Sequence, residues 1–169
     1  MNAKNNKYIY DKTNYISDKY KKNTFSYQTI SYIKEIKNKY NSNSKIIGFT
    51  CGSFDKLSEN NNLIEMLKEC KNICDILVVG LHADPSINRS SKSVPIQSLE
   101  ERIKQLKECN YVDEIIEYNT EDDLLNILIY LKPNIRIIGE EWKNKDYTGC
   151  NFNHIQIYYY CERVVSVNK

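Results

Sequence analysis

The 169-residue chain lacks the long apolar stretch, about 18 to 20 residues, that a membrane-spanning helix requires. Its first residues, Met1 to Lys7, lack the apolar core of a secretory signal. With only three Pro and five Gly, the chain is neither collagen-like nor a flexible linker. Hydrophobic residues make up 41% of the chain and charged residues 27%, as is typical of a globular domain. We therefore expect a cytoplasmic protein rather than a membrane or secreted one.

Metal-binding patterns are also scarce. The chain has two His, at positions 82 and 154, and no Cys-x-x-Cys pair, so we expect no metal site built from its own side chains. A catalytic cysteine would require one of these two His as its base, a pairing that the sequence does not show. We expect reduced thiols, several of them in the core, at Cys51, Cys70, Cys74, Cys109, Cys150 and Cys161.

Charge is distributed unevenly along the chain. Residues 1–44 contain nine Lys, three acidic residues and seven of the 14 Tyr, although the whole chain has a net charge of only +2. We interpret residues 1–44 as a basic, solvated extension with one short helix, and residues 45–169 as the main domain. Lys and Tyr also suit nucleic acid, through phosphate contacts and base stacking. The acidic main domain argues against nucleic acid as the principal ligand.

Apolar runs alternate with helical patterns after the extension. Continuous apolar runs predict buried strands at 45–50, 75–81, 112–116, 135–138 and 155–160. Apolar spacing and capping residues predict helices over 29–40, from Asn61 or Asn62, from a capping box that opens at Ser98, and after Thr120. This alternation predicts an α/β fold: a Rossmann-like parallel sheet of about five strands with helices on both faces.

A sheet of this kind binds ligands in the crevice at the carboxyl ends of its strands. The loops expected at that edge are 51–62, 82–97, 139–149 and the segment from 161 onward. In the first loop, Gly48 and Gly52 precede a helix N-terminus, a backbone geometry that suits a phosphate. The loop matches neither the Walker A nor the GxGxxG pattern, so alone it indicates phosphate binding only weakly.

The other loops supply cations and one aromatic residue. Arg89, Lys92 and Arg102 suit either a triphosphate or an ordinary solvated surface. Trp142, the only tryptophan, suits either a stacked base or the core. From the residues alone, both interpretations of each group stay open.

Six short segments occur in an order that is specific to one family. They are Cys51-Gly52-Ser53-Phe54-Asp55, Asp75 to Asp84, Lys92 with Ser98 to Arg102, Tyr111 to Ile116, Lys132 to Ile135, and Gly139-Glu140-Glu141-Trp142. In this order the segments resemble the cytidylyltransferase family, and most closely its glycerol-3-phosphate cytidylyltransferase-like branch. The resemblance extends from residue 46 to residue 163.

This resemblance implies transfer of CMP from CTP to a phosphorylated alcohol, release of pyrophosphate, and Mg²⁺ escorting the triphosphate. The implied partners are CTP or a related nucleotide, a phosphorylated small molecule, and a second copy of the chain that would contact residues 111–113. Lys92 would pair with the triphosphate, and Arg102 would serve the nucleotide or the acceptor phosphate. The other implied binding residues are Cys51, Gly52, Ser53, Phe54, Asp55, Asp84, Gly139, Glu141, Trp142 and Ser166.

The sequence departs from the family after the Phe-Asp turn. There the family has a His-x-Gly-His motif, whereas residues 57–62 contain no His. Asn60 or Asn61 can supply amide donors but no positive charge, and Glu59 would add a negative charge beside the substrate. Loss of one preorganised donor lowers a rate by about 10²- to 10³-fold. The candidate catalytic residues are thus Lys92, Asn60, Asn61 and Arg163.

A second departure lies near the C-terminus. Arg163 and Ser166 stand where the family has an Arg and a Ser/Thr-rich turn, but no match to its final helix follows. Three interpretations stay open: an enzyme of reduced activity, a catalytically silent nucleotide-binding or assembly module, and a nucleic-acid-associated protein that uses the extension. The first two require Ser53, Lys92 and Trp142 to line one pocket.

Overall fold

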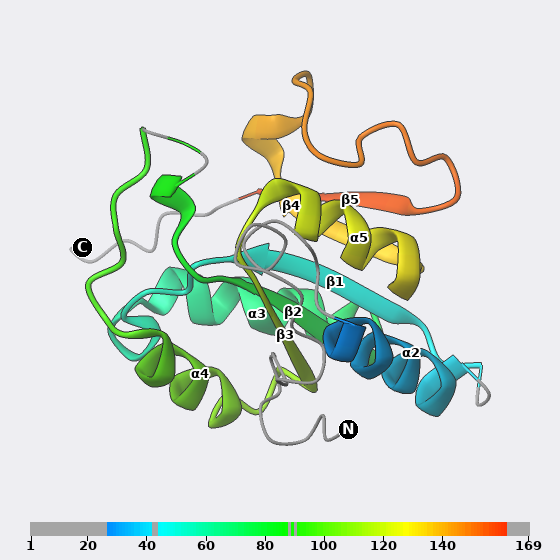
Figure 1. Ribbon diagram of the computed structural model, residues 1–169, viewed down its shortest axis with the longest axis horizontal. Helices are drawn as coiled ribbons and strands as arrows, with labels where there is room; N and C mark the ends of the chain where they lie inside the picture. Colours follow the sequence, from blue (N-terminus) through cyan, green and yellow to red (C-terminus); the bar gives the residue numbers. More distant parts are fainter. Residues whose placement is uncertain (1–26, 42–43, 88, 90, 162–169) are drawn as a thin grey trace.

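The computed structural model describes residues 27–41, 44–87, 89 and 91–161. Its centre is a five-stranded sheet in the order β3-β2-β1-β4-β5, in which every pair of neighbours is parallel (Figure 1). The strands are β1 (Ile47–Gly52), β2 (Ile76–His82), β3 (Glu114–Tyr118), β4 (Ile135–Gly139) and β5 (Gln156–Tyr160). The predicted α/β fold is confirmed, and each strand overlaps a predicted apolar run.

Two layers of helices cover the sheet. Helices α2 (Tyr27–Asn41) and α5 (Glu121–Leu131) share one buried cluster with side chains from β1, β2 and β3. Helices α3 (Asn61–Asn72) and α4 (Leu99–Lys107) share a second cluster with the opposite face of the sheet. All seven residues of β2 are buried. This two-sided burial explains why the strands are continuously apolar.

Local capping chemistry sets where the helices begin. Ser98 with Glu101 and Thr120 with Asp123 form complete capping boxes at α4 and α5. Helix α3 begins at Asn61 as predicted, but its cap is the preceding residue, Asn60, whose side chain accepts from the amide of Leu63. The capping residue is therefore one position before the predicted helix start, and neither Asn61 nor Asn62 caps the helix.

Helix α2 belongs to the predicted extension but packs on the sheet. Ile33 and Ile36 are fully or almost fully buried. The hydroxyls of Tyr32 and Tyr40 donate to the carboxylate of Glu114 in β3, at 3.1 and 2.7 Å. A boundary at residue 44 therefore separates α2 from the domain in sequence but not in space. Residues 1–26, which hold most of the extension's lysines, lie outside the described part.

The carboxyl ends of four strands lie at one edge of the sheet. Gly52 of β1 pairs with Leu81 of β2, and Gly139 of β4 pairs with Tyr160 of β5. The loops that leave these strands consequently meet above the same edge (Figure 1). Across the described residues, no helix is both long and apolar enough to span a bilayer.

Candidate nucleotide-binding site

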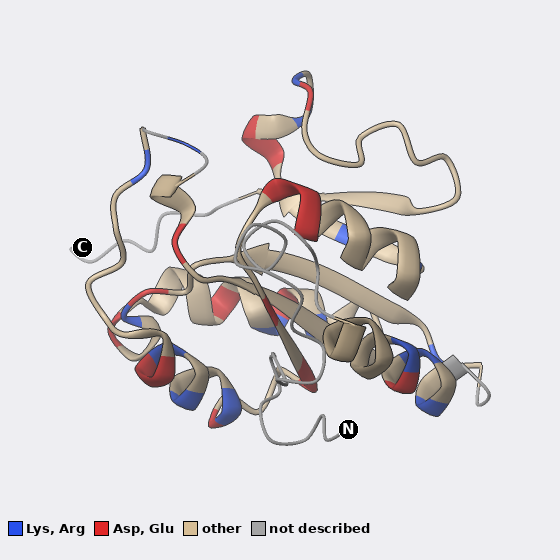
Figure 2. Cartoon of the chain, in the orientation of Figure 1, with Lys and Arg blue, Asp and Glu red and all other residues tan. Residues whose placement is uncertain are grey.

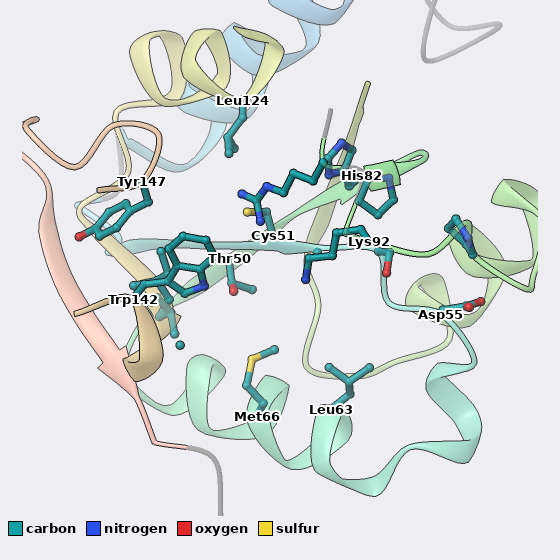
Figure 3. Close-up of a pocket in the computed structure, with 18 of the residues that line it drawn as sticks. Thr50, Cys51, Asp55, Leu63, Met66, His82, Lys92, Leu124, Trp142 and Tyr147 are labelled. Carbon is teal, nitrogen blue, oxygen red and sulfur yellow. The ribbon is translucent and has the colours of Figure 1, made fainter. Parts of the chain in front are cut away.

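A cavity of about 630 Å³ opens at this edge of the sheet. Figure 3 shows Leu124 of α5 on one side, and Leu63 and Met66 of α3 on the opposite side. In the same view Trp142 and Tyr147 lie on one side of the cavity, and Lys92 and Asp55 lie on the side across from them. Ser53, Lys92 and Trp142 all line this one cavity, although 89 positions separate the first from the last.

The turn after β1 has an unusual backbone. Phe54 and Lys56 adopt left-handed conformations, with φ angles of 49° and 54°. Non-glycine residues in this region cost about 1 to 3 kcal/mol when strained, and they cluster at ligand sites. Cys51, Gly52, Ser53 and Asp55 line the cavity, whereas the Phe54 side chain is buried. The turn thus presents its backbone to the cavity.

Asp55 fixes this turn against the loop before α4. Its carboxylate accepts from the backbone amides of Ile96 and Gln97, at 2.7 and 2.9 Å. Burial acts to raise the pKa of Asp55, but these amides and the nearby Arg102 outweigh it and lower the pKa. A carboxylate used in this way holds the loop rather than a ligand.

The three asparagines at the start of α3 have different environments. The carbonyl oxygen of Asn60 is occupied as the helix cap, although the residue also lines the cavity. Asn61 is exposed and is absent from the cavity wall. Asn62 lines the cavity, and its buried Oδ1 has no hydrogen-bond partner among the described residues. Glu59 pairs with Lys56 at 3.6 Å outside the cavity, so the expected negative charge beside the substrate is not seen there.

The loop after β2 contributes cations to the cavity. Lys92 is exposed at the cavity wall, and no salt bridge in the described part includes it. Arg89 lies 3.6 Å from Glu121 and places its guanidinium 5.1 Å from the ring centre of Trp142. Asp84 does not line the cavity; it accepts from the amide and hydroxyl of Ser86 in a local turn.

Arg102 lies behind the cavity wall rather than in it. Arg102 is 3% exposed, and its guanidinium donates to four backbone carbonyls. These are the carbonyls of Ser53, His82, Ala83 and Gln97, at 2.7 to 3.2 Å. Burial lowers the pKa of Arg102, while Asp55 and Asp84 act in the opposite direction. The side chain joins the turns after β1 and β2 to the start of α4.

The exit from β4 places acidic and aromatic groups at the cavity. Gly139, Glu141 and Trp142 line it from β4 and the short 3-10 helix η5 (Glu140–Trp142). A Cβ at Gly139 would overlap the Glu141 carboxylate, so glycine allows that close approach. Figure 2 shows acidic residues at η5 and at the start of α5. The cationic side chains at the cavity wall include Lys92, Arg89 and Arg136.

Several cavity residues were not singled out in the sequence as ligand contacts. His82 is buried, donates from Nε2 to the carbonyl of Asn119 at 3.1 Å, and stacks on Tyr118 at 4.5 Å. Burial lowers the pKa of His82 and raises that of Tyr118. Nothing in the sequence predicts that Asn62 lines the cavity. Arg136 could have been predicted, because it interrupts an otherwise apolar strand. The predicted residues Arg163 and Ser166 lie outside the described residues.

The cavity has single carboxylates rather than a metal cage. No group of three His, Cys, Asp or Glu side chains suited to a metal occurs in the described ranges. Asp55 and Glu141 line the cavity individually. Nucleotide-bound Mg²⁺ is held mainly by phosphates and water, with one or two protein carboxylates. Because backbone amides occupy both oxygens of Asp55, Glu141 is a cavity carboxylate that fits a magnesium ion arriving with a triphosphate.

The fold and the cavity define a Rossmann-like domain with a ligand crevice at its strand ends. The chain belongs to the cytidylyltransferase-like family, whose profile matches residues 49–164. The predicted membership of the cytidylyltransferase family is thus confirmed.

Curated proteins similar to this chain include two named Bifunctional protein HldE. The one from Campylobacter jejuni strain RM1221 is 34% identical over 133 residues, which are 75% of this chain and 28% of that protein. The one from Helicobacter pylori strain G27 is 33% identical over 111 residues, or 65% of this chain and 23% of that protein. The chain thus spans about a quarter of the length of these relatives.

Solved structures with the same fold include a lipopolysaccharide core biosynthesis protein from Thermoplasma volcanium. It is 26% identical, with a TM-score of 0.55, and the match covers 70% of this chain and 97% of that chain. Pantoate-beta-alanine ligase from Francisella tularensis, at 18% identity and a TM-score of 0.54, shares the fold over 78% of this chain and 64% of its own.

Proposed function

We propose that this chain is a nucleotidyltransferase that transfers CMP from CTP to a phosphorylated alcohol such as glycerol 3-phosphate. An acceptor phosphate oxygen would bond to the α-phosphorus of CTP while the bond to the β-phosphate oxygen breaks and pyrophosphate leaves. The observation that carries the proposal is the single cavity lined by Ser53, Lys92 and Trp142. It combines a backbone turn suited to phosphate, a cation without a partner in the described ranges, and an aromatic wall suited to a base.

In this proposal, each part of the nucleotide contacts a different group of cavity residues. The backbone of the turn at Ser53 would face the phosphates, and Lys92 would neutralise charge on the leaving pyrophosphate. Trp142 would stack on or wall the base, and Glu141 would accept from a ribose hydroxyl. Mg²⁺, bound with the triphosphate, would supply further charge neutralisation. Asp55 and Arg102 would hold the loops that form this surface.

The start of α3 supports a reduced activity. Asn60 and Asn61 offer only neutral amides, and the carbonyl oxygen of Asn60 already caps the helix. The same observation favours a second candidate function, a catalytically silent nucleotide-binding module. Both candidates predict nucleotide binding; only the enzyme predicts pyrophosphate.

Pyrophosphate release over a panel of nucleotides and acceptors tests the enzyme directly. CTP, ATP, UTP and GTP would each be combined with glycerol 3-phosphate and with phosphorylated sugars. The sugars are included because one structural neighbour is named a lipopolysaccharide core biosynthesis protein. We expect acceptor-dependent release that Lys92→Ala abolishes. Lys104→Ala, at an exposed position of α4 outside the cavity wall, should leave it unchanged. Nucleotide binding without release under every condition would leave only the silent module.

The same pyrophosphate assay can be repeated with two variants at the start of α3, Asn60→His and Asn61→His. We expect Asn60→His to raise the rate, because position 60 lines the cavity and a His there adds a titratable donor. Asn61→His should gain less, because Asn61 is absent from the cavity wall, but it leaves the α3 cap intact and so serves as the stability control. The proposal also includes a homodimer that uses residues 111–113, which precede the edge strand β3; analytical ultracentrifugation would measure it.

A further inference from the structure

One side of the cavity contains a buried cation that has no part in the proposed nucleotide contacts. Arg136, in β4, is 3% exposed and lines the cavity. Its Nη1 donates to the carbonyl of Thr148, and its guanidinium lies 5.1 Å from the ring centre of Tyr147. No salt bridge in the described part of the chain includes Arg136. Burying a cation without an anion is unfavourable, so an anionic ligand would complete this group.

The loop from η5 to β5 is built around this guanidinium. Gly149 has a φ of +80°, and a Cβ there would lie 3.2 Å from Nη1 of Arg136. In the two residues before Gly149, Thr148 donates to Glu121 at 2.8 Å and the hydroxyl of Tyr147 lies 2.8 Å from that of Tyr159. These contacts hold the loop on Arg136 while its Nε and Nη2 have no hydrogen bond to a described residue.

The contrast with Arg102 shows that burial alone does not leave donors open. Arg102 is equally buried, but all three of its nitrogens donate to backbone carbonyls, and it does not line the cavity. Arg136 uses one nitrogen and does line the cavity. A guanidinium with open donors is suited to a phosphate or a carboxylate.

We propose that Arg136 binds an anionic group, phosphate or carboxylate, of the acceptor substrate in the part of the cavity beside α5. This inference rests on the proposed transferase function. The nucleotide already has a cation, Lys92, and an aromatic wall, Trp142. Arg136 contacts Tyr147, which lies across the opening from Lys92 in Figure 3. Glu121 and Thr148 would bind hydroxyls beside the anion, which indicates a hydroxyl-bearing acceptor.

Nuclear magnetic resonance of the arginine Nε–H groups tests the site without requiring catalysis. The chain has four Arg, at positions 89, 102, 136 and 163, so the spectrum is simple, and Arg136→Lys assigns the signal of interest. Inorganic phosphate and acetate should shift the Arg136 signal saturably and leave the Arg102 signal unmoved. Comparing glycerol 3-phosphate with glycerate then distinguishes a phosphate ligand from a carboxylate. No shift of Arg136 with any of the four would overturn the proposal.

Variants separate this inference from the transferase proposal. Arg136→Lys keeps the charge in case Arg136→Met does not fold, and we expect about 10- to 100-fold weaker binding of the acceptor with unchanged CTP binding. In an active enzyme the same factor should appear in the acceptor KM. Weaker binding of CTP in these variants, in place of weaker acceptor binding, would overturn the proposed role of Arg136. So would an Arg136 signal that shifts with CTP alone and does not shift further when the acceptor is added. If phosphate shifts the Arg136 signal but the protein does not bind CTP, the anion site is supported and the transferase proposal is rejected.

Discussion

Replacing Arg102 by Met tests whether this residue holds the site together or binds a ligand. The substitution removes the guanidinium and leaves the carbonyls of Ser53, His82, Ala83 and Gln97 without this donor. A hydrogen bond from a charged donor is worth about 1.5 to 3 kcal/mol, but bonds that share one group are not additive. Removal of a buried charged partner costs about 3 to 5 kcal/mol, and we expect a loss of about that size.

Urea unfolding at neutral pH measures this loss, and thermal unfolding checks it. For a domain of this size the Tm should fall by roughly 6 to 20 °C. Arg89→Met is the matched control, because Arg89 is half-exposed and its 3.6 Å pair with Glu121 is worth less than about 1 kcal/mol. A variant as stable as the wild type that no longer binds nucleotide would refute the structural role and favour ligand binding.

Three further changes have defined outcomes. The pKa of His82 in the folded protein is below its ordinary value of about 6.5, so the unfolded chain binds more protons there. The free energy of unfolding should therefore fall as the pH drops below about 6.5, by at most about 1.4 kcal/mol per pH unit. In urea titrations His82→Phe should reduce that slope. Asn60→Ala should cost about 1 kcal/mol in the same assay through loss of the α3 cap, whereas Ser58→Ala, outside the cap, should cost less. Gly149→Ala should cost at least about 1 to 3 kcal/mol, because φ is +80° and the new Cβ would meet Leu128, and more than Gly52→Ala; equal costs would contradict this reasoning.

The elements could be predicted because their signals are local. The capping boxes at Ser98 and Thr120 span only four residues each, and the fully buried β2 is a single apolar run. The parallel sheet followed from the alternation of such runs with helices. The order of the segments also revealed the family, since a fixed order of six motifs is more specific than any one of them.

The environments of the site residues depend on contacts that sequence does not reveal. Arg102 bonds to a carbonyl 49 positions away, so its charge looked like a ligand group. Tyr32 of α2 meets Glu114 across 82 positions, so the helix could be predicted but its packing could not. Arg136 did leave a signal, a charge within an apolar strand, whereas Asn62 did not.

Titration of the protein with magnesium CTP, followed through the emission of Trp142, tests the central claim most directly. Trp142 is the only tryptophan and lines the cavity, so its emission reports on that cavity alone. We expect a saturable change at up to millimolar CTP, with a midpoint at least about tenfold higher in Lys92→Ala. No saturable change, together with no CTP-dependent rise in Tm, would contradict the assignment of this cavity to a nucleotide.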